Sequence, residues 1–245
     1  MSPEASPKIY VYDHAAMLYE ETARAILHLT RAKDGPFSIA LAGGATPKGL
    51  YVRMAQPPFR DLFDWDQIHF FWGDERWVPP SDKRSNQLMV RESLLKKASI
   101  QEDHIHPVPV GLASAEEVAQ AYEKRLREFF QTSETFPAFD LILLGLGEDG
   151  HTASLFPGEK ALDEKNAWVC VTRRDSEEPR ISLTLPVINR ANHVFFLVSG
   201  SRKKNILKEV LHPGAETPDY PARRVNPENR QLVWFVDRNA ASAAK

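Results

Sequence analysis

Short apolar runs alternate along the chain with longer stretches whose apolar residues recur at helical spacing. The stretch after the first run, for example, places Ala16, Tyr19, Ala23 and Ile26 on one helical face. The predicted strands are Ile9–Tyr12, Ser38–Ala42, Ile68–Trp72, Phe139–Leu144, Trp168–Thr172, Ile181–Leu185, Val194–Ser199 and Leu232–Val236. The predicted helices are Ala15–Arg31, Pro47–Met54, Asn86–Lys97, Glu116–Phe130 and Ser201–Leu211.

This succession of strand, helix and strand predicts an α/β fold with an open, mostly parallel sheet and helices on both faces. Phe139–Leu144 is apolar throughout, which is typical of a central strand covered on both faces. No long polar or Pro/Gly-rich linker divides the sequence, so residues 1–245 are expected to form a single domain. Ligands of such sheets bind outside the carboxyl ends of the strands, and the loops there are the first place to look for chemistry.

The charge and composition of the chain limit the classes of molecule that it can bind. The chain has a formal net charge of −2 and a pI near 6.5. That excludes broad, non-specific binding to nucleic acid, which needs a strongly basic surface, but leaves room for a local basic pocket. No secretory signal pattern is visible and no apolar stretch is long enough to cross a bilayer, so we expect no membrane partner and a cytoplasmic location.

Cysteine and histidine usage points away from disulfides and metals. The single cysteine, Cys170, lies in an apolar run, where a buried structural thiol is favoured over a nucleophile. There is no HExxH, no CxxC and no close His/His pair on a helix. His104 and His106 are two residues apart, but no carboxylate is obviously joined to them, so no metal site is predicted.

The second predicted strand ends in Gly43-Gly44-Ala45-Thr46-Pro47 and leads into a helix. Thr46 suits the N-cap and Pro47 the first helical position. Glycines let the backbone approach a ligand, and the free N–H groups of a helix N-terminus bind phosphate. The loop matches neither the dinucleotide-binding nor the P-loop pattern, and a tight turn without a ligand is the alternative.

Charged residues follow the third predicted strand, in Gly73-Asp74-Glu75-Arg76-Trp77, and Ser85-Asn86 comes soon after. An arginine can hold a phosphate through two N–H groups, so Arg76 is a candidate anion contact. Asp74, Ser85 and Asn86 are candidate substrate contacts beside it. The alternative is a surface pair between Arg76 and Asp74 or Glu75.

A glycine-dense loop, Gly145-Leu146-Gly147-Glu148-Asp149-Gly150-His151, follows the central predicted strand. Histidine exchanges a proton near neutral pH, so His151 is a candidate general base. Asp149 can orient or stabilise its imidazole, and glycines such as Gly150 would let a substrate reach the ring. The alternative is a structural histidine.

Two further candidate anion contacts lie near later strands. Lys203 belongs to Ser199-Gly200-Ser201-Arg202-Lys203-Lys204, a strand end that leads into a helix, and can neutralise a phosphate as a point charge. A solvated basic helix start is the alternative, although positive side chains oppose the helix dipole there. Arg180 begins the Ile181 strand and is either an anion contact or a surface residue.

In order and spacing these loops resemble the 6-phosphogluconolactonase family of the glucosamine-6-phosphate isomerase/deaminase superfamily. The resemblance runs from Ile39 to about Asp237, and Gly145 to Pro157 is its most specific motif. It is completed by Arg180 to Pro186 and by Gly200 through Lys203. Lys83-Arg84 departs from the family, in which an acidic residue is common before Ser85.

The resemblance implies a Rossmann-like sheet of the sugar-phosphate isomerase type and hydrolysis of 6-phospho-D-glucono-1,5-lactone to 6-phosphogluconate, the second step of the oxidative pentose phosphate pathway. It implies that His151 acts as general base, that Arg76, Lys203 and the Gly43-Gly44 amides lie near the phosphate, and that no cofactor is used. The expected partner is the phosphosugar lactone, bound by a monomer or a weak homodimer.

Two alternatives remain. One is a glucosamine-6-phosphate isomerase/deaminase, but its relatives carry a carboxylate after the Asp-Gly-His motif, whereas Thr152-Ala153-Ser154-Leu155-Phe156-Pro157 has none. The other is a non-catalytic sugar-phosphate-binding domain. Such sensors usually carry a DNA-binding module, for which the residues before Gly43 leave no room, and both His151 and Asp149 are present.

Overall fold

Six parallel strands form the main sheet of the computed structural model, which describes residues 7–132, 135–174, 178–229 and 231–242. The strands lie in the spatial order β1-β9-β8-β5-β2-β3. Their bounds are β1 Lys8–Tyr12, β2 Phe37–Leu41, β3 Ile68–Trp72, β5 Leu141–Leu144, β8 Val194–Val198 and β9 Leu232–Asp237. The prediction of an open, mostly parallel α/β sheet is confirmed.

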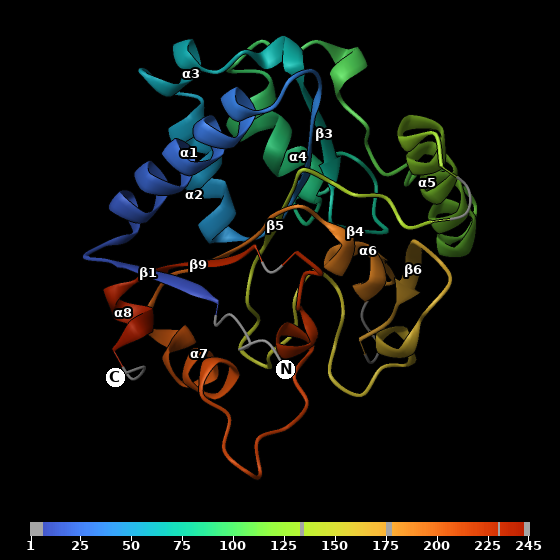
Figure 1. Ribbon diagram of the computed structural model, residues 1–245. Coiled ribbons are helices and arrows are strands. Elements are labelled where there is room, and N and C mark those ends of the chain that lie inside the picture. The colour runs from blue at the N-terminus through green and yellow to red at the C-terminus, as the bar shows by residue number, and fades with distance from the viewer. Residues whose placement is uncertain (1–6, 133–134, 175–177, 230, 243–245) are drawn as a thin grey trace.

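Helices cover both faces of this sheet. Figure 1 shows α1 and α2 on one side of strands β1 and β9, with α7 and α8 on the other. The α-helices are α1 Ala15–Ala32, α2 Ala45–Met54, α3 Phe59–Leu62, α4 Asn86–Val90, α5 Ala115–Phe130, α6 Leu185–Arg190, α7 Lys204–Leu211 and α8 Arg238–Ala241. Because helices pack on both sides, every residue of β2, β5 and β8 is buried, and all of these residues except Ser38 are apolar.

The order of the strands reverses between β2 and β5. From β2 the chain continues to β3 at one edge, then returns to β5 on the other side of β2 and proceeds to β8 and β9. A crevice forms at such a switch point, outside the carboxyl ends of the strands. The loops after β2, β3, β5 and β8 therefore meet at one edge of the sheet.

A second, antiparallel sheet was not expected. It consists of β4 (Asp74–Arg76), β7 (Arg180–Leu183) and β6 (Val169–Thr172) in the order β4-β7-β6. The predicted strands Trp168–Thr172 and Ile181–Leu185 exist, but they belong to this sheet, and Leu185 already begins α6. Both β6 and β7 lie against α5.

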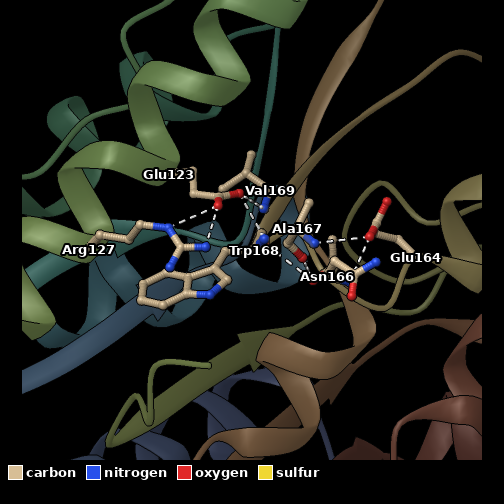
Figure 2. A network of polar contacts seen from close by, with 8 residues as sticks. Glu123, Arg127, Glu164, Asn166, Ala167, Trp168 and Val169 are labelled. Atoms are coloured by element: carbon tan, nitrogen blue, oxygen red, sulfur yellow. Dashed lines mark hydrogen bonds and ion pairs between the residues drawn. The ribbon is translucent and has the colours of Figure 1, made fainter. Parts of the chain in front are cut away.

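A carboxylate on α5 fixes this small sheet to the rest of the fold (Figure 2). Glu123 Oε2 accepts hydrogen bonds from the backbone nitrogens of Trp168 (2.8 Å) and Val169 (3.2 Å) at the start of β6. Its other oxygen accepts from Arg127, whose guanidinium lies 4.2 Å from the centre of the Trp168 ring. The helix and the strand are thus joined by both charge and stacking.

Smaller differences concern element ends. The predicted helix Asn86–Lys97 is α4 followed by a π-helical turn, Arg91–Leu95, in which Ser93 Oγ donates to the Met89 carbonyl at 2.6 Å. Such turns are a tertiary effect that apolar spacing does not reveal. The predicted helix from Ser201 begins as a 3-10 turn, Ser201–Lys203, before α7. Within the described part of the chain, every helix is too short or too polar to span a bilayer.

Candidate active site

A cleft of about 910 Å³ opens where the loops after β2, β3, β5 and β8 meet. Its volume suits a small-molecule ligand. The predicted site residues that line it are Gly43, Gly44, Thr46, Asp74, Arg76, Asn86, Asp149, His151, Arg180 and Lys203. Loops far apart in the sequence are therefore brought together around one space.

His151 and Asp149 form a hydrogen-bonded pair in the loop after β5. The Nδ1 atom of His151 lies 2.5 Å from Oδ1 of Asp149, and the same oxygen accepts from the His151 backbone nitrogen at 3.2 Å. A Cβ on Gly147 would lie 2.0 Å from His151 Nδ1, so glycine is required for the ring to sit there. With Nδ1 directed at a carboxylate, Nε2 is the ring nitrogen left to accept a proton.

Arg174 completes this pair, and the sequence analysis missed it. Its Nη2 lies 3.3 Å from Oδ2 of Asp149, the oxygen that His151 does not use. Partial burial would raise the pKa of Asp149, but the hydrogen bond and charge of His151, with Arg174, hold it well below its ordinary value. Asp149 therefore stays ionised beside the imidazole. Arg174 follows the predicted strand Trp168–Thr172, and a basic residue past a strand end was the available signal.

The ring of Phe156 lies beside His151 and two arginine side chains. Its buried ring centre lies 4.8 Å from the ring centre of His151. The guanidinium carbons of Arg180 and Arg174 lie 5.2 and 5.6 Å from it. The aromatic face thereby holds two cations beside the imidazole through cation–π contact.

The other side of the cleft is built from backbone and hydroxyl groups. Gly44 has φ +98°, which favours glycine, and directly precedes α2. A Cβ on Gly43 would lie 2.1 Å from Asn86 Oδ1, so the loop and Asn86 approach as closely as glycine allows. Thr46 Oγ1 and Ser199 Oγ lie 2.8 Å apart and join this loop to the one after β8. The helix N-terminus with its free N–H groups thus faces the cleft.

Arg76 and Lys203 bring further positive charge to the cleft. Arg76 Nη1 donates to the Arg84 carbonyl at 2.9 Å, while its buried Nε has no hydrogen-bond acceptor among the described residues. A buried donor without a partner is costly, and an anionic ligand would satisfy it. Burial, and less strongly Arg202, lower the pKa of Lys203, although Glu148 and Asp149 oppose this.

Asp74 and Glu75 make hydrogen bonds that hold the neighbouring loops in place. Asp74 Oδ2 accepts from Ser154 Oγ at 2.6 Å, and Asn86 Nδ2 donates to the Asp74 carbonyl at 3.0 Å. Glu75 is fully buried and accepts from the backbone nitrogens of Asn86 (2.8 Å) and Gln87 (2.7 Å). Burial raises the pKa of Glu75, while these N–H groups act against the rise. Glu75 was expected only as a surface partner of Arg76.

Two predicted contacts do not line the cleft. Ser85 is buried and caps α4, accepting from Leu88 N and donating to Glu75 Oε2, both at 3.1 Å. Gly150 has φ +80°, and a Cβ there would lie 2.3 Å from the Tyr220 ring. Both positions shape the loops that carry Asn86 and His151 rather than facing the cavity.

Cys170 and the paired histidines His69 and His106 take no part in the cleft. Burial raises the pKa of Cys170 to about 12, which leaves the thiol protonated and unreactive at neutral pH. His106 Nε2 lies 3.0 Å from Nδ1 of His69, on edge strand β3. No group of three or more His, Cys, Asp or Glu side chains within the described ranges could hold a metal ion.

Known proteins resemble this chain in sequence and in fold. Residues 12–234 match the family described as glucosamine-6-phosphate isomerases/6-phosphogluconolactonase. A 6-phosphogluconolactonase of Synechocystis sp. is 47% identical over 210 residues, which cover 85% of each chain. The structure of 6-phosphogluconolactonase from Trypanosoma cruzi superimposes with a TM-score of 0.86 at 33% identity, covering 97% of this chain and 96% of that one. A monomeric glucosamine-6-phosphate deaminase shares the fold, with a TM-score of 0.82 at 17% identity over 96% of this chain and 99% of the other.

Proposed function

The chain belongs to the glucosamine-6-phosphate isomerase/6-phosphogluconolactonase family, and we propose that it hydrolyses 6-phosphogluconolactone to 6-phosphogluconate at the cleft around His151. The observation that carries the proposal is the His151–Asp149 pair at 2.5 Å, set in the same cleft as Arg76 Nε, which has no hydrogen-bond acceptor among the described residues. The cleft thus holds both a base and an anion site, as a phosphorylated ester requires.

The base activates water. Nε2 of His151 takes a proton from a water molecule as its oxygen attacks the lactone carbonyl, and the Asp149 carboxylate stabilises the imidazolium that forms. The ring ester is electrophilic enough for direct attack, so no covalent nucleophile is needed. The proton then passes to the ring oxygen as the C–O bond breaks, which gives the open carboxylic acid.

Positive charge stabilises the negative oxygen of the tetrahedral intermediate. The guanidinium groups of Arg174 and Arg180 stand over Phe156, beside the imidazole. Charges held in place before the reaction stabilise a developing oxyanion without reorganisation at the moment of attack. Phe156 therefore serves the chemistry by fixing these groups in one arrangement.

The phosphate anchors the other end of the substrate. Arg76, Lys203 and the N–H groups at the start of α2 are its proposed contacts, with Thr46 and Asn86 lining the space between them. Anchoring a remote phosphate supplies binding energy that orients the reacting carbonyl. The phosphorylated lactone should therefore be preferred to its unphosphorylated form.

The chain lacks the carboxylate that glucosamine-6-phosphate deaminases carry after the Asp-Gly-His motif. In the segment after His151, Thr152 Oγ1 donates to the Gly145 carbonyl at 2.9 Å, and Ser154 Oγ donates to Asp74. Both hydroxyl groups are used to hold the loop, and no acidic side chain takes part in the segment Thr152–Pro157. Ring opening of an amino sugar would lack the group that assists it.

Substrate turnover tests the proposal. Purified protein should accelerate loss of freshly prepared 6-phosphogluconolactone above its spontaneous hydrolysis and leave glucosamine 6-phosphate unchanged. The rate should survive exhaustive treatment with EDTA, because the proposed reaction uses no metal ion. Conversion of glucosamine 6-phosphate, or metal-dependent turnover, would contradict the proposal.

The setting of the activity is part of the proposal. Residues 1–245 act as one domain in the cytoplasm, as a monomer or weak homodimer without nucleic acid. The net charge of −2 and the single cysteine support this. Light scattering of the purified protein tests the oligomeric state.

A further inference from the structure

The backbone of Gly150 sets how the two members of the His151–Asp149 pair face each other. Gly150 lies between them in the chain, so its two backbone torsions fix their relative orientation. Its φ is +80°, in the left-handed region, and glycine has wide freedom in both torsions. Contacts from outside the loop are therefore needed to hold Gly150 in this one conformation.

The segment after α7 supplies those contacts. The chain leaves α7 in a long loop, orange-red in Figure 1, and enters a 3-10 turn at Pro221–Arg224. Within this turn, Ala222 N donates to the Gly150 carbonyl at 3.1 Å. The Tyr220 ring fills the space that a side chain at position 150 would need, since a Cβ there would lie 2.3 Å from Cδ1 and 2.5 Å from Cγ of the ring. Gly150 is thus held by one hydrogen bond and by an aromatic ring.

Tyr220 is itself anchored to the fold. Its backbone nitrogen donates to the Pro218 carbonyl at 2.9 Å, and its carbonyl accepts from Arg223 N at 2.9 Å. Its Oη donates to Glu209 Oε2 at 2.5 Å, and Glu209 lies on α7, which directly follows the turn that carries Lys203. The ring therefore cannot move away from Gly150 without breaking contacts at both of its ends.

We propose that Tyr220 is a positioning residue for the general base, whose ring keeps Gly150 in the conformation that directs His151 at Asp149. The inference rests on the proposed function, in which this pair activates water. A misplacement of about 1 Å in a reacting group can cost roughly 10²-fold in rate. Tyr220 does not line the cleft, so it should affect turnover and leave binding of the substrate unchanged.

Kinetics of three variants test the role of the ring. Tyr220→Ala should lower kcat roughly 10- to 100-fold while KM for 6-phosphogluconolactone stays within about three-fold of the parent. Tyr220→Phe keeps the ring and loses only the bond to the exposed Glu209, so its kcat should stay within about three-fold. Arg223→Ala is the matched control, because this exposed side chain of the same turn donates to the Pro218 carbonyl at 3.1 Å. Its kcat and KM should equal those of the parent.

Amide hydrogen exchange gives a readout that does not depend on activity. Gly147 N donates to the His151 carbonyl at 2.8 Å, so exchange of this amide reports opening of the loop. Exchange at Gly147 should be roughly ten-fold faster in Tyr220→Ala and unchanged in Tyr220→Phe and Arg223→Ala, while the amides of β5 keep their protection. If Tyr220→Ala does not fold, Tyr220→Leu, which lacks the planar ring, takes its place with the same expected results.

Three outcomes would overturn the inference. The first is a parent that hydrolyses the lactone together with a Tyr220→Ala variant of equal kcat. The second is unchanged exchange at Gly147, and the third is faster exchange in β5 as well, which would show a general loss of stability. If the parent itself does not hydrolyse the lactone, the proposed function fails separately, and exchange at Gly147 still decides whether Tyr220 holds the loop.

Discussion

His151 Nδ1 and Asp149 Oδ1 lie 2.5 Å apart, and the second oxygen of Asp149 lies 3.3 Å from Arg174. The carboxylate therefore has one oxygen for the base and one for a cation. The His151 contact fixes which ring nitrogen carries the proton, and the Arg174 contact limits rotation of the carboxylate.

Asp149→Asn should lower kcat by at least ~10²-fold, because an amide cannot stabilise the imidazolium by charge. Steady-state kinetics of the parent and the variant at neutral pH measure this effect. An unchanged kcat would separate Asp149 from the base.

Arg174→Ala should lower kcat by roughly 10²-fold, because the variant loses one of the two cations proposed to stabilise the oxyanion, in addition to the partly exposed ion pair with Asp149. Arg173 is its matched control: it pairs with Glu116 at 2.6 Å, on α5, and does not line the cleft. Arg173→Ala should leave kcat and KM within two-fold of the parent. Equal effects of the two substitutions would show that general loss of charge, and not the contact with Asp149, is responsible.

The carboxyl ends of the strands could be located from the sequence, because apolar runs that end in glycine are a local signal. The antiparallel sheet could not, since β4 is Asp74-Glu75-Arg76 and resembles a charged loop. It becomes a strand through pairing of Glu75 with Ile181, more than a hundred residues away. Likewise, nothing near Trp168 in the sequence reveals that Glu123 will bind its backbone nitrogen.

Site residues on strand-end loops were predicted because their chemistry and their position agreed. Ser85 illustrates the limit, since a serine that caps a helix and one that binds a ligand have the same local sequence. Arg174 was missed because its partner, Asp149, lies on a different loop. The roles of Glu75 and Phe156 depend on burial, which the sequence gives only through the complete fold.

Arg76→Ala and Lys203→Ala should each raise KM for 6-phosphogluconolactone roughly 10- to 150-fold, because a charge-assisted hydrogen bond is worth roughly 1.5–3 kcal/mol. KM for unphosphorylated gluconolactone should change much less. Parallel kinetics on the two lactones make the comparison. If KM rises equally for both lactones, neither side chain recognises the phosphate.

Lys203 also gives the binding of product a pH dependence. Burial lowers its pKa below the ordinary lysine value of 10.5, and a bound phosphate dianion favours the charged ammonium. Binding therefore takes up a proton at high pH and weakens as the pH rises through the pKa of the free lysine. Affinity for 6-phosphogluconate should therefore fall as the pH rises through the lowered pKa of Lys203, while the phosphate remains a dianion.

Lys203→Arg is the control for this titration, because arginine keeps its charge as the pH rises through that value. Calorimetric titration should give a dissociation constant for the variant that varies little with pH. A variant as pH-sensitive as the parent would assign the titration to another group.

The central claim is that His151 is the base that activates water for lactone hydrolysis. Its most direct test is the rate of hydrolysis of freshly prepared 6-phosphogluconolactone by the parent and by His151→Ala, each corrected for spontaneous hydrolysis. The account predicts that the variant keeps its circular dichroism spectrum and its affinity for 6-phosphogluconate while kcat falls ~10²–10⁴-fold. A folded variant whose kcat stays within three-fold of the parent would contradict it.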